Sequence, residues 1–236
     1  MYQKFENIAI MPARIGSERI KKKNIKFFYG KPMLHWTYEI IKKSKIFNKI
    51  VLTSDCDQIL SIGRKIGFDI LIKRPKKLSN SYVGIAPVIK HAINYLVNQS
   101  IISNQVCCVY PCNPFILVKD LKKAKNLASE NINNFIFPVT NYTHPIERSL
   151  YLNSFNNKLT YVNKKFIHVR TQDLKKTFYD TGQFYFTSSK TWLDIKKSIY
   201  IGIPIPNWRA VDIDTPEDWK RAEILFKTLK KNNNDH

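Results

Sequence analysis

The sequence predicts an α/β protein with a Rossmann-like, mostly parallel sheet. Short β-branched runs alternate with longer amphipathic stretches through the first 140 residues, as in proteins whose parallel strands are joined by helices. The 236 residues, 44% of them hydrophobic, are enough for one large domain with a full core. We expect a single domain over residues 1–231 and a frayed, Asn- and Lys-rich tail at 232–236.

The alternating half supplies most of the predicted sheet. Its strands, each rich in β-branched residues, are expected at 7–11, 50–53, 68–72, 106–110 and 135–139. Its helices, each with apolar residues at helical spacing, are expected at 33–45, 56–66, 85–99 and 119–129. Sheets of this type bind ligands beyond the carboxyl ends of their strands, so the loops there are expected to carry the chemistry.

The alternation fails between about 140 and 181, where we expect an insertion or flap. After it, the pattern predicts strands at 182–187, 201–205 and 210–213 and a short helix at 191–196. The final helix has the clearest start. Thr215 suits the N-cap, Pro216 the first helical position, and the acids that follow suit the positive end of the helix.

The charge balance, 39 basic against 18 acidic residues, gives a net charge of +21 and raises the possibility of a nucleic-acid-binding protein. However, the lysines are spread along the whole chain, and no recognised nucleic-acid-binding motif is present. We therefore keep that function as an alternative. It predicts salt-dependent retention on polyanions without a nucleotide preference.

The chain shows no sign of secretion or of membrane insertion. No apolar run approaches the ~20 residues of a membrane span, and no signal-type segment precedes the first strand. The four cysteines form no CxxC pair, so reduced structural thiols are expected. These observations predict a cytoplasmic protein without a membrane partner.

The loop after the first predicted strand, residues 12–24, is strongly basic. It holds a Gly-Ser turn flanked by two arginines and three lysines. Backbone donors and cationic side chains are what a polyphosphate requires, yet the loop matches neither the P-loop nor the dinucleotide-binding pattern. On its residues alone, the loop is interpreted as a solvated basic loop slightly more readily than as a phosphate site.

Two acids lie near the end of the chain, in Val211-Asp212-Ile213-Asp214. In a strand this spacing places both carboxylates on one face, where they would suit Mg²⁺. The alternative is that Asp214 helps to cap the next helix and that Asp212 lies in water.

The basic loop and the acidic segment each belong to a longer motif, and both motifs resemble the same family. The stretch Pro-Ala-Arg-x-Gly-Ser-x-Arg-Ile-x-x-Lys-Asn-Ile, from position 12, resembles the N-terminal signature of the CMP-sugar cytidylyltransferases that activate sialic-acid-like sugars. Asp-Ile-Asp-Thr-Pro-Glu-Asp-Trp, from position 212, is similar to another family-wide motif. Arg-Thr-Gln-Asp-Leu at 170–174 and Gly-Gln-Phe-Tyr at 182–185 resemble the branch that acts on pseudaminic acid. The similarity extends over about residues 8–229.

The resemblance implies the fold of nucleotide-diphospho-sugar transferases, with the 140–181 insertion as a dimerisation flap. It also implies an activity: CMP is transferred from CTP to the anomeric hydroxyl of a nonulosonic acid, most closely pseudaminic acid, and pyrophosphate leaves. The implied cofactor is Mg²⁺ on Asp212 and Asp214. The implied assembly is a homodimer in which the flap of one subunit extends towards its partner's site.

Site residues follow from the same resemblance. Arg14 and Lys23 are implied at the phosphates as the catalytic cations. The nucleotide-binding set is Ala13, Arg14, Gly16, Ser17, Lys23, Asn24 and Arg74. The sugar-binding set is Arg170, Gln172 and Gln183, although Arg170 and Gln172 could instead brace the flap or a dimer contact. Asp55 resembles part of a family turn, but we interpret it as a helix N-cap.

The chain also departs from the family pattern. Ile15, Glu18 and Lys21 stand where Gly, Lys and Pro are usual, and Glu18 would repel a nearby phosphate. A degenerate, weakly active relative is therefore one alternative. Another keeps the reaction but changes the sugar to N-acetylneuraminate, legionaminate or KDO.

Overall fold

The computed structural model describes residues 1–195 and 199–234. In this part of the chain, an eight-stranded sheet has the order β10-β7-β11-β6-β1-β4-β5, with β12 also paired to β7. Its strands are β1 (Gln3–Pro12), β4 (Lys49–Ser54), β5 (Ile70–Lys73), β6 (Ile101–Val109), β7 (Phe135–Asn141), β10 (Phe178–Asp180), β11 (Phe184–Ser188) and β12 (Tyr200–Pro204). The β6-β1-β4-β5 half is parallel, β12 is parallel to β7, and β10 and β11 are antiparallel to their neighbours. The predicted α/β class with a mostly parallel sheet is confirmed.

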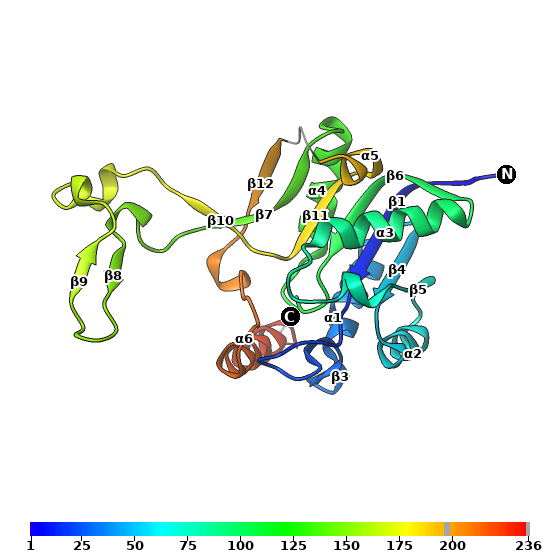
Figure 1. The fold of residues 1–236 in the computed structure, drawn as a ribbon, viewed down its shortest axis with the longest axis horizontal. Helices are drawn as coiled ribbons and strands as arrows, with labels where there is room; N and C mark the ends of the chain where they lie inside the picture. The colour runs from blue at the N-terminus through cyan, green and yellow to red at the C-terminus, as the bar shows by residue number, and fades with distance from the viewer. Residues whose placement is uncertain (196–198, 235–236) are drawn as a thin grey trace.

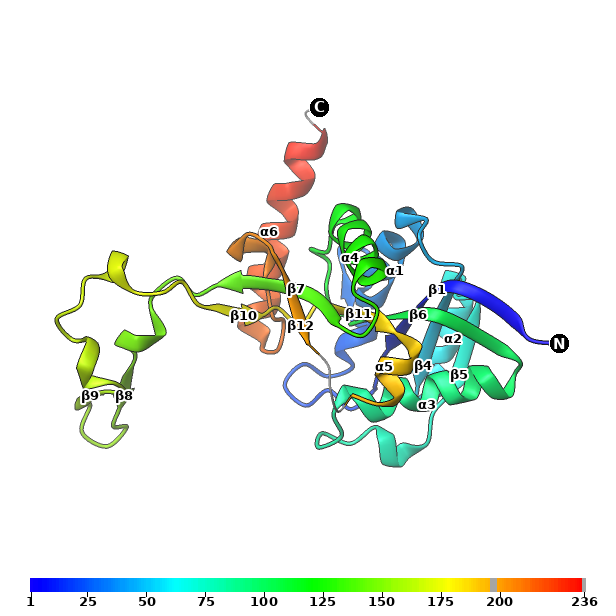
Figure 2. The same ribbon diagram turned by 90° about the horizontal axis from the view of Figure 1, so that it is seen from above.

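Helices cover both faces of the sheet. They are α1 (Met33–Ser44), α2 (Asp57–Ile66), α3 (Ile85–Asn98), α4 (Val118–Glu130), α5 (Ser189–Leu193) and α6 (Pro216–Asn234). Figure 2 shows α1 and α4 on one side of the sheet and α3 and α5 on the other. The remaining elements are the two-stranded pairs β2 (Phe27–Phe28) with β3 (Lys31–Pro32) and β8 (Leu150–Leu152) with β9 (Leu159–Tyr161), and six 3-10 turns at Lys23–Ile25, Lys76–Leu78, Ile146–Arg148, Lys164–Phe166, Thr171–Asp173 and Asn207–Arg209.

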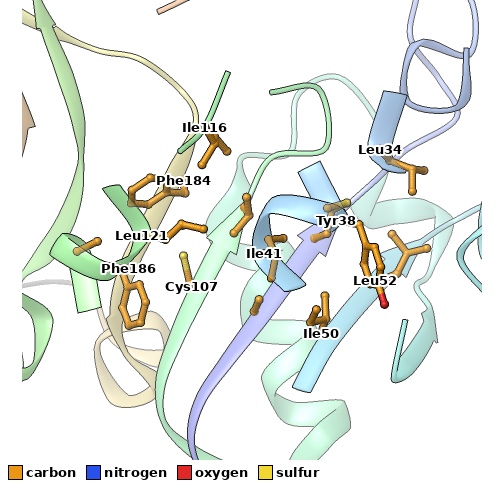
Figure 3. Close-up of a cluster of buried hydrophobic side chains, with 14 of the residues drawn as sticks. Leu34, Tyr38, Ile41, Ile50, Leu52, Cys107, Ile116, Leu121, Phe184 and Phe186 are labelled. Carbon is orange, nitrogen blue, oxygen red and sulfur yellow. The ribbon is translucent and has the colours of Figure 1, made fainter. Parts of the chain in front are cut away.

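The side chains of the central strand, β1, point alternately to the two faces of the sheet and so contribute to two hydrophobic cores. Ala9 and Met11 of β1 face the core beneath α1, α2 and α4, part of which is shown in Figure 3. Ile8 and Ile10 face the core beneath α3 and α5. Since successive side chains of a strand point to opposite faces, a strand that is apolar throughout must be covered on both sides. The core therefore holds the carboxyl ends of β1, β4 and β6 in fixed positions.

The insertion projects from this body as a separate lobe (Figure 1). β7 and β10 form its base, and the β8–β9 hairpin lies at its far end. The side chains of β8 and β9 are exposed throughout.

Several predicted boundaries differ from the structure. No strand forms at 210–213, because this segment pairs with no neighbouring strand and runs as irregular chain between the turn Asn207–Arg209 and α6. α5 begins at Ser189, earlier than predicted, because the Ser188 hydroxyl caps it by accepting from the Thr191 amide. The predicted end of that helix, residue 196, lies outside the described residues. α6 extends to Asn234, into the expected tail, of which 235 and 236 are likewise outside.

Candidate active site

A pocket of about 900 Å³ lies at the carboxyl ends of the parallel strands. Five segments form its wall: the loop after β1, the loop that precedes α3, residues 110–113 after β6, residues 179–185 at the base of the flap, and residues 210–214 before α6. The loops after the strands thus carry the pocket, as the strand order of an open α/β sheet predicts.

The basic loop and the acidic segment meet in this pocket. Lys23 Nζ lies 2.8 Å from Asp214 Oδ1 and donates to the carbonyl of Ile213 at 2.6 Å. The guanidinium of Arg19 pairs with the other oxygen of Asp214. These residues are about 190 positions apart in sequence, so only the tertiary fold brings them together.

The acidic segment presents its two carboxylates to the pocket although it is not a strand. Val211 and Ile213 are buried against α6 and its neighbours, whereas Asp212 and Asp214 line the wall. The amides of Asp214 and Thr215 donate to the carboxylate of Asp218, at 3.2 and 2.8 Å, and the Thr215 hydroxyl accepts from the Asp218 amide. This confirms the predicted cap of the last helix. The cap, rather than a sheet ladder, satisfies the backbone here.

A buried ion pair fixes the chain just before the acidic segment 211–214. Arg209, which is 2% exposed, donates to both oxygens of Asp120 at 2.5 and 3.2 Å. The side chain of Gln183, also buried, donates to the Arg209 carbonyl at 2.8 Å. Because Arg209 precedes the acid pair by only a few residues, these contacts fix where the two carboxylates emerge.

The two acids differ in their electrostatic surroundings. The partly enclosed wall and the charge of Asp214 raise the pKa of Asp212. Partial burial also raises the pKa of Asp214, but the hydrogen bond and charge of Lys23 and the charge of Arg19 outweigh it, and the pKa falls below its ordinary value. Within the described residues, the Asp212 carboxylate receives no hydrogen bond or ion pair. It is the acid of the pair that is left available to a ligand.

The nucleotide-side residues form a connected set. Asn24 is buried and its amide donates to the Arg14 carbonyl at 2.8 Å. Arg74, 4% exposed, donates to Ser79 and lies 3.8 Å from Asp55 Oδ1, which accepts from the Ile15 amide. The prediction that Asp55 caps a helix is wrong, because Cys56 occupies the N-cap of α2 and Asp55 instead ties the basic loop to Arg74.

Comparison with known proteins identifies the family. The cytidylyltransferase family model matches residues 8–230, nearly the whole chain. This chain belongs to the cytidylyltransferase family. A pseudaminic acid cytidylyltransferase of Campylobacter jejuni is 38% identical, with 94% of this chain and 97% of the relative covered. A Helicobacter pylori protein that combines pseudaminic acid cytidylyltransferase with a hydrolase is 30% identical over 80% of this chain, which spans 36% of that longer protein.

Solved structures agree on the fold. A CMP:2-keto-3-deoxy-manno-octonic acid synthetase in complex with CTP has a TM-score of 0.69 at 12% identity, and covers 95% of this chain and 100% of its own. A 4-diphosphocytidyl-2C-methyl-D-erythritol synthase has a TM-score of 0.65 at 10% identity, with 94% and 98% covered. The predicted family and the predicted CTP-dependent nucleotidyltransferase activity are confirmed. The alternative of a nucleic-acid-binding protein gains no support.

The fold of this cytidylyltransferase brings together most of the predicted site residues. Those that line the pocket are Arg14, Ser17, Lys23, Asn24, Arg74, Asp212 and Asp214. Ala13 is buried behind the wall, where its amide donates to the Thr53 carbonyl, and Gly16 is exposed outside the wall. Glu18, the unusual acid, does line the pocket.

The predicted sugar contacts do not line the pocket of their own chain. Gln183 lies beneath the pocket wall with its amide committed to Arg209. Arg170 and Gln172 belong to the flap, where Arg170 pairs with Asp173 at 2.9 Å. Arg19, which sequence reasoning placed in the basic loop without a site role, does line the pocket, and so do Tyr110, Asp180 and Tyr185, which were not assigned to the site. Tyr110 could have been found, because it ends a predicted parallel strand, at the edge of the sheet where ligands bind.

Cys112 also lines the pocket, but its thiol is not poised as a nucleophile. Burial raises the pKa of Cys112 to about 12, so its thiol is neutral at physiological pH.

No helix in the described ranges is long and apolar enough to cross a membrane. The described residues also hold no group of three or more His, Cys, Asp or Glu side chains placed to bind a metal, so a cation here would rely on fewer protein ligands.

Proposed function

We propose that this cytidylyltransferase transfers CMP from CTP to pseudaminic acid and releases pyrophosphate. The similarity to the Campylobacter jejuni enzyme supports this most directly, because it extends over 94% of the chain and 97% of the relative at 38% identity. Identities of 10 to 12% support only the fold for the structural neighbours, whose substrates differ. The relative therefore favours pseudaminic acid over N-acetylneuraminate, legionaminate or KDO.

The residues of the pocket suit this reaction. The anomeric hydroxyl of the sugar attacks the α-phosphate, so negative charge grows on the phosphate oxygens and on the departing pyrophosphate. Arg14, Arg19 and Lys23 supply positive charge along one wall. Fixed cations in a partly enclosed site stabilise such charge without having to reorganise during the reaction. Asn24, through its bond to the Arg14 carbonyl, holds the loop in shape.

We also propose Mg²⁺ as the cofactor, held by Asp212 and Asp214. The observation behind this is chemical: two carboxylates line one pocket, and partial burial, together with repulsion by Asp214, raises the pKa of Asp212. A divalent cation would relieve that repulsion. Mg²⁺ is commonly bound through one or two carboxylates, with water and substrate phosphates completing its shell. When bound, it would neutralise charge on the phosphates.

The decisive experiment is a pyrophosphate-release assay with CTP and Mg²⁺. Pseudaminate, N-acetylneuraminate, legionaminate and KDO serve as acceptors, and UTP, ATP and GTP replace CTP as controls. We expect the highest kcat/KM with CTP and pseudaminate. A higher value for another acid would reassign the sugar, and release without nucleotide preference would reject the proposal.

Glu18→Lys should improve CTP binding, because Glu18 lines the pocket beside Arg19 and repels the phosphates. The side chain is exposed, and solvent therefore screens the effect. We expect the KM for CTP to fall about 3- to 10-fold. Glu130→Lys, the same change at an exposed position outside the pocket, should leave it unaltered. An unchanged KM in both variants would show that Glu18 does not affect the triphosphate.

We further propose a homodimer, formed through the flap, in the cytoplasm, where CTP is available. The flap exposes large apolar side chains that a lone subunit leaves in water: Tyr151, Leu152, Phe155 and Leu159 are 60 to 98% exposed. Clustered exposure of this kind marks an interaction surface. In a dimer, Arg170 and Gln172 would serve the partner's pocket, which agrees with their absence from the lining of the pocket in their own chain.

Leu152→Ser with Phe155→Ser tests the dimer. Each removed side chain would forfeit about 1.5–3 kcal/mol of burial, so light scattering should find monomer where the unaltered chain is dimeric. Ile132→Ser, at an equally exposed apolar residue outside the flap, should leave the dimer intact. A monomeric unaltered chain with normal turnover would rule out the dimer.

A further inference from the structure

The base of the flap and the end of β6 contribute to the pocket a group of side chains that the proposed function has not yet used. Asp180 ends β10, Tyr185 lies on β11, and Tyr110 follows β6, and all three line the pocket. The rings of Tyr110 and Tyr185 meet edge to face, with centroids 5.9 Å apart. This group, here called the Asp180 group, belongs to the same cavity as the basic loop.

Internal contacts fix the orientation of the Asp180 carboxylate. Oδ1 accepts from the Gly182 amide at 2.8 Å, and Oδ2 accepts from the Tyr185 hydroxyl. Gly182 has a positive φ of 61°, so the turn that delivers this amide suits glycine. A carboxylate can accept about four hydrogen bonds. Two acceptor positions are therefore left on a group that is exposed to the pocket.

The charge of Asp180 indicates which part of a ligand it can contact. A carboxylate repels phosphates, and it would equally repel the carboxylate of a sugar acid. Asp180 has no cationic partner among the described residues, whereas Asp214 is paired with Arg19 and Lys23. The groups that suit it are neutral donors, namely hydroxyls and amide N–H groups.

Tyr185 and Tyr110 complete this environment. Since the Tyr185 hydroxyl donates to Asp180, its oxygen is left as an acceptor. Burial raises the pKa of both tyrosines, so both remain neutral hydroxyls at physiological pH. Their rings add an apolar surface that suits the methyl of an acyl group.

We propose that Asp180, oriented by Tyr185, is a specificity-determining residue that accepts hydrogen bonds from the hydroxyl or acylamino N–H donors of the sugar. This rests on the proposed function, because it assigns the sugar end of the same pocket. The anionic end of the sugar then lies towards the cations of the basic loop, and its neutral, acylated part towards the Asp180 group.

Asp180→Asn is the sharpest test. The asparagine can still accept from the Gly182 amide, so the turn persists, but one acceptor oxygen becomes a donor. We expect the KM for pseudaminate to rise at least tenfold while the KM for CTP changes less than twofold. Tyr185→Phe should change the same two constants in the same directions, by a smaller factor. Asp57→Asn, at an exposed carboxylate outside the pocket, is the matched control and should change neither constant.

The outcomes separate this proposal from the one on which it rests. If the unaltered enzyme uses pseudaminate and Asp180→Asn leaves its KM unchanged, the specificity role is wrong and the proposed function stands. An equal rise in both KM values, with a lowered melting temperature, would show a structural role and also overturn it. If the unaltered enzyme transfers CMP to none of the four acids, both proposals fail.

Discussion

Asp212→Ala is expected to lower kcat/KM for CTP by about 10³-fold in the pyrophosphate-release assay, in the range found when a group that stabilises transition-state charge is removed. Asp212 lines the pocket, and no described side chain donates to it or pairs with it. Its removal therefore takes away a contact to ligands rather than one that supports the fold. The dependence on Mg²⁺ concentration should shift to higher values in the same variant.

A melting-temperature measurement separates the loss of a ligand contact in Asp212→Ala from a loss of folding. The surroundings of Asp212, together with Asp214, raise its pKa and so disfavour its charged form. The alanine variant should accordingly melt at the same temperature as the unaltered chain or slightly above it. Asp57→Ala, which removes an exposed carboxylate from α2, should keep full activity. Undiminished pyrophosphate release from Asp212→Ala would remove the acid pair from the mechanism.

Asp120→Ala should have the largest effect on stability, lowering the free energy of unfolding by about 3–5 kcal/mol. It leaves the Arg209 guanidinium buried without its partner, and it also removes the acceptor for the Leu117 amide at the start of α4. Because Arg209 anchors the segment that carries Asp212 and Asp214, CTP binding should weaken as well. Urea denaturation followed by circular dichroism measures the first effect.

The solvent-exposed ion pair Arg170–Asp173 serves as a control for the buried pair Arg209–Asp120. In Arg170–Asp173 the side chains are 72 and 47% exposed, so Asp173→Ala should cost less than about 1 kcal/mol. Replacing Arg209 and Asp120 together by apolar residues of similar volume should recover much of the stability lost in Asp120→Ala. Equal losses in the buried and exposed pairs would contradict the account given for Arg209.

The sequence was sufficient for the fold class because parallel strands covered on both faces are apolar along their length. The starts and ends of the individual strands were harder to predict. β6 begins at Ile101, before its predicted start, since the polar residues Ser103, Asn104 and Gln105 interrupt its apolar run. The alternation of Val211 to Asp214 was read as a strand, but burial of Val211 and Ile213 against α6 produces the same pattern without a neighbouring strand.

The site was predictable where it follows parallel strands. Arg14, Lys23, Asn24 and Arg74 all lie in loops of that kind, and they line or shape the pocket. Asp180 was not predicted, because it lies in the insertion, whose path the sequence pattern does not define. Tyr185 falls in the strand predicted at 182–187, but the pattern does not show that this strand pairs antiparallel with β6 and reaches the pocket. Asp55 was assigned to a helix cap because its contacts with Ile15 and Arg74 exist only in the folded chain.

The order of the segments along the chain has a consequence for synthesis. The cations of the pocket lie within residues 14–74, whereas Asp214, the partner of Arg19 and Lys23, and the neighbouring Asp212 come near the end of the chain. A nascent chain still on the ribosome can pair β1, β4, β5 and β6 before those acids are translated. Until then its basic loop is an unbalanced positive surface, attractive to any polyanion in reach, ribosomal RNA included. The segment that carries Asp212 and Asp214 thus both finishes the pocket and lowers the positive charge of a surface that could attract RNA.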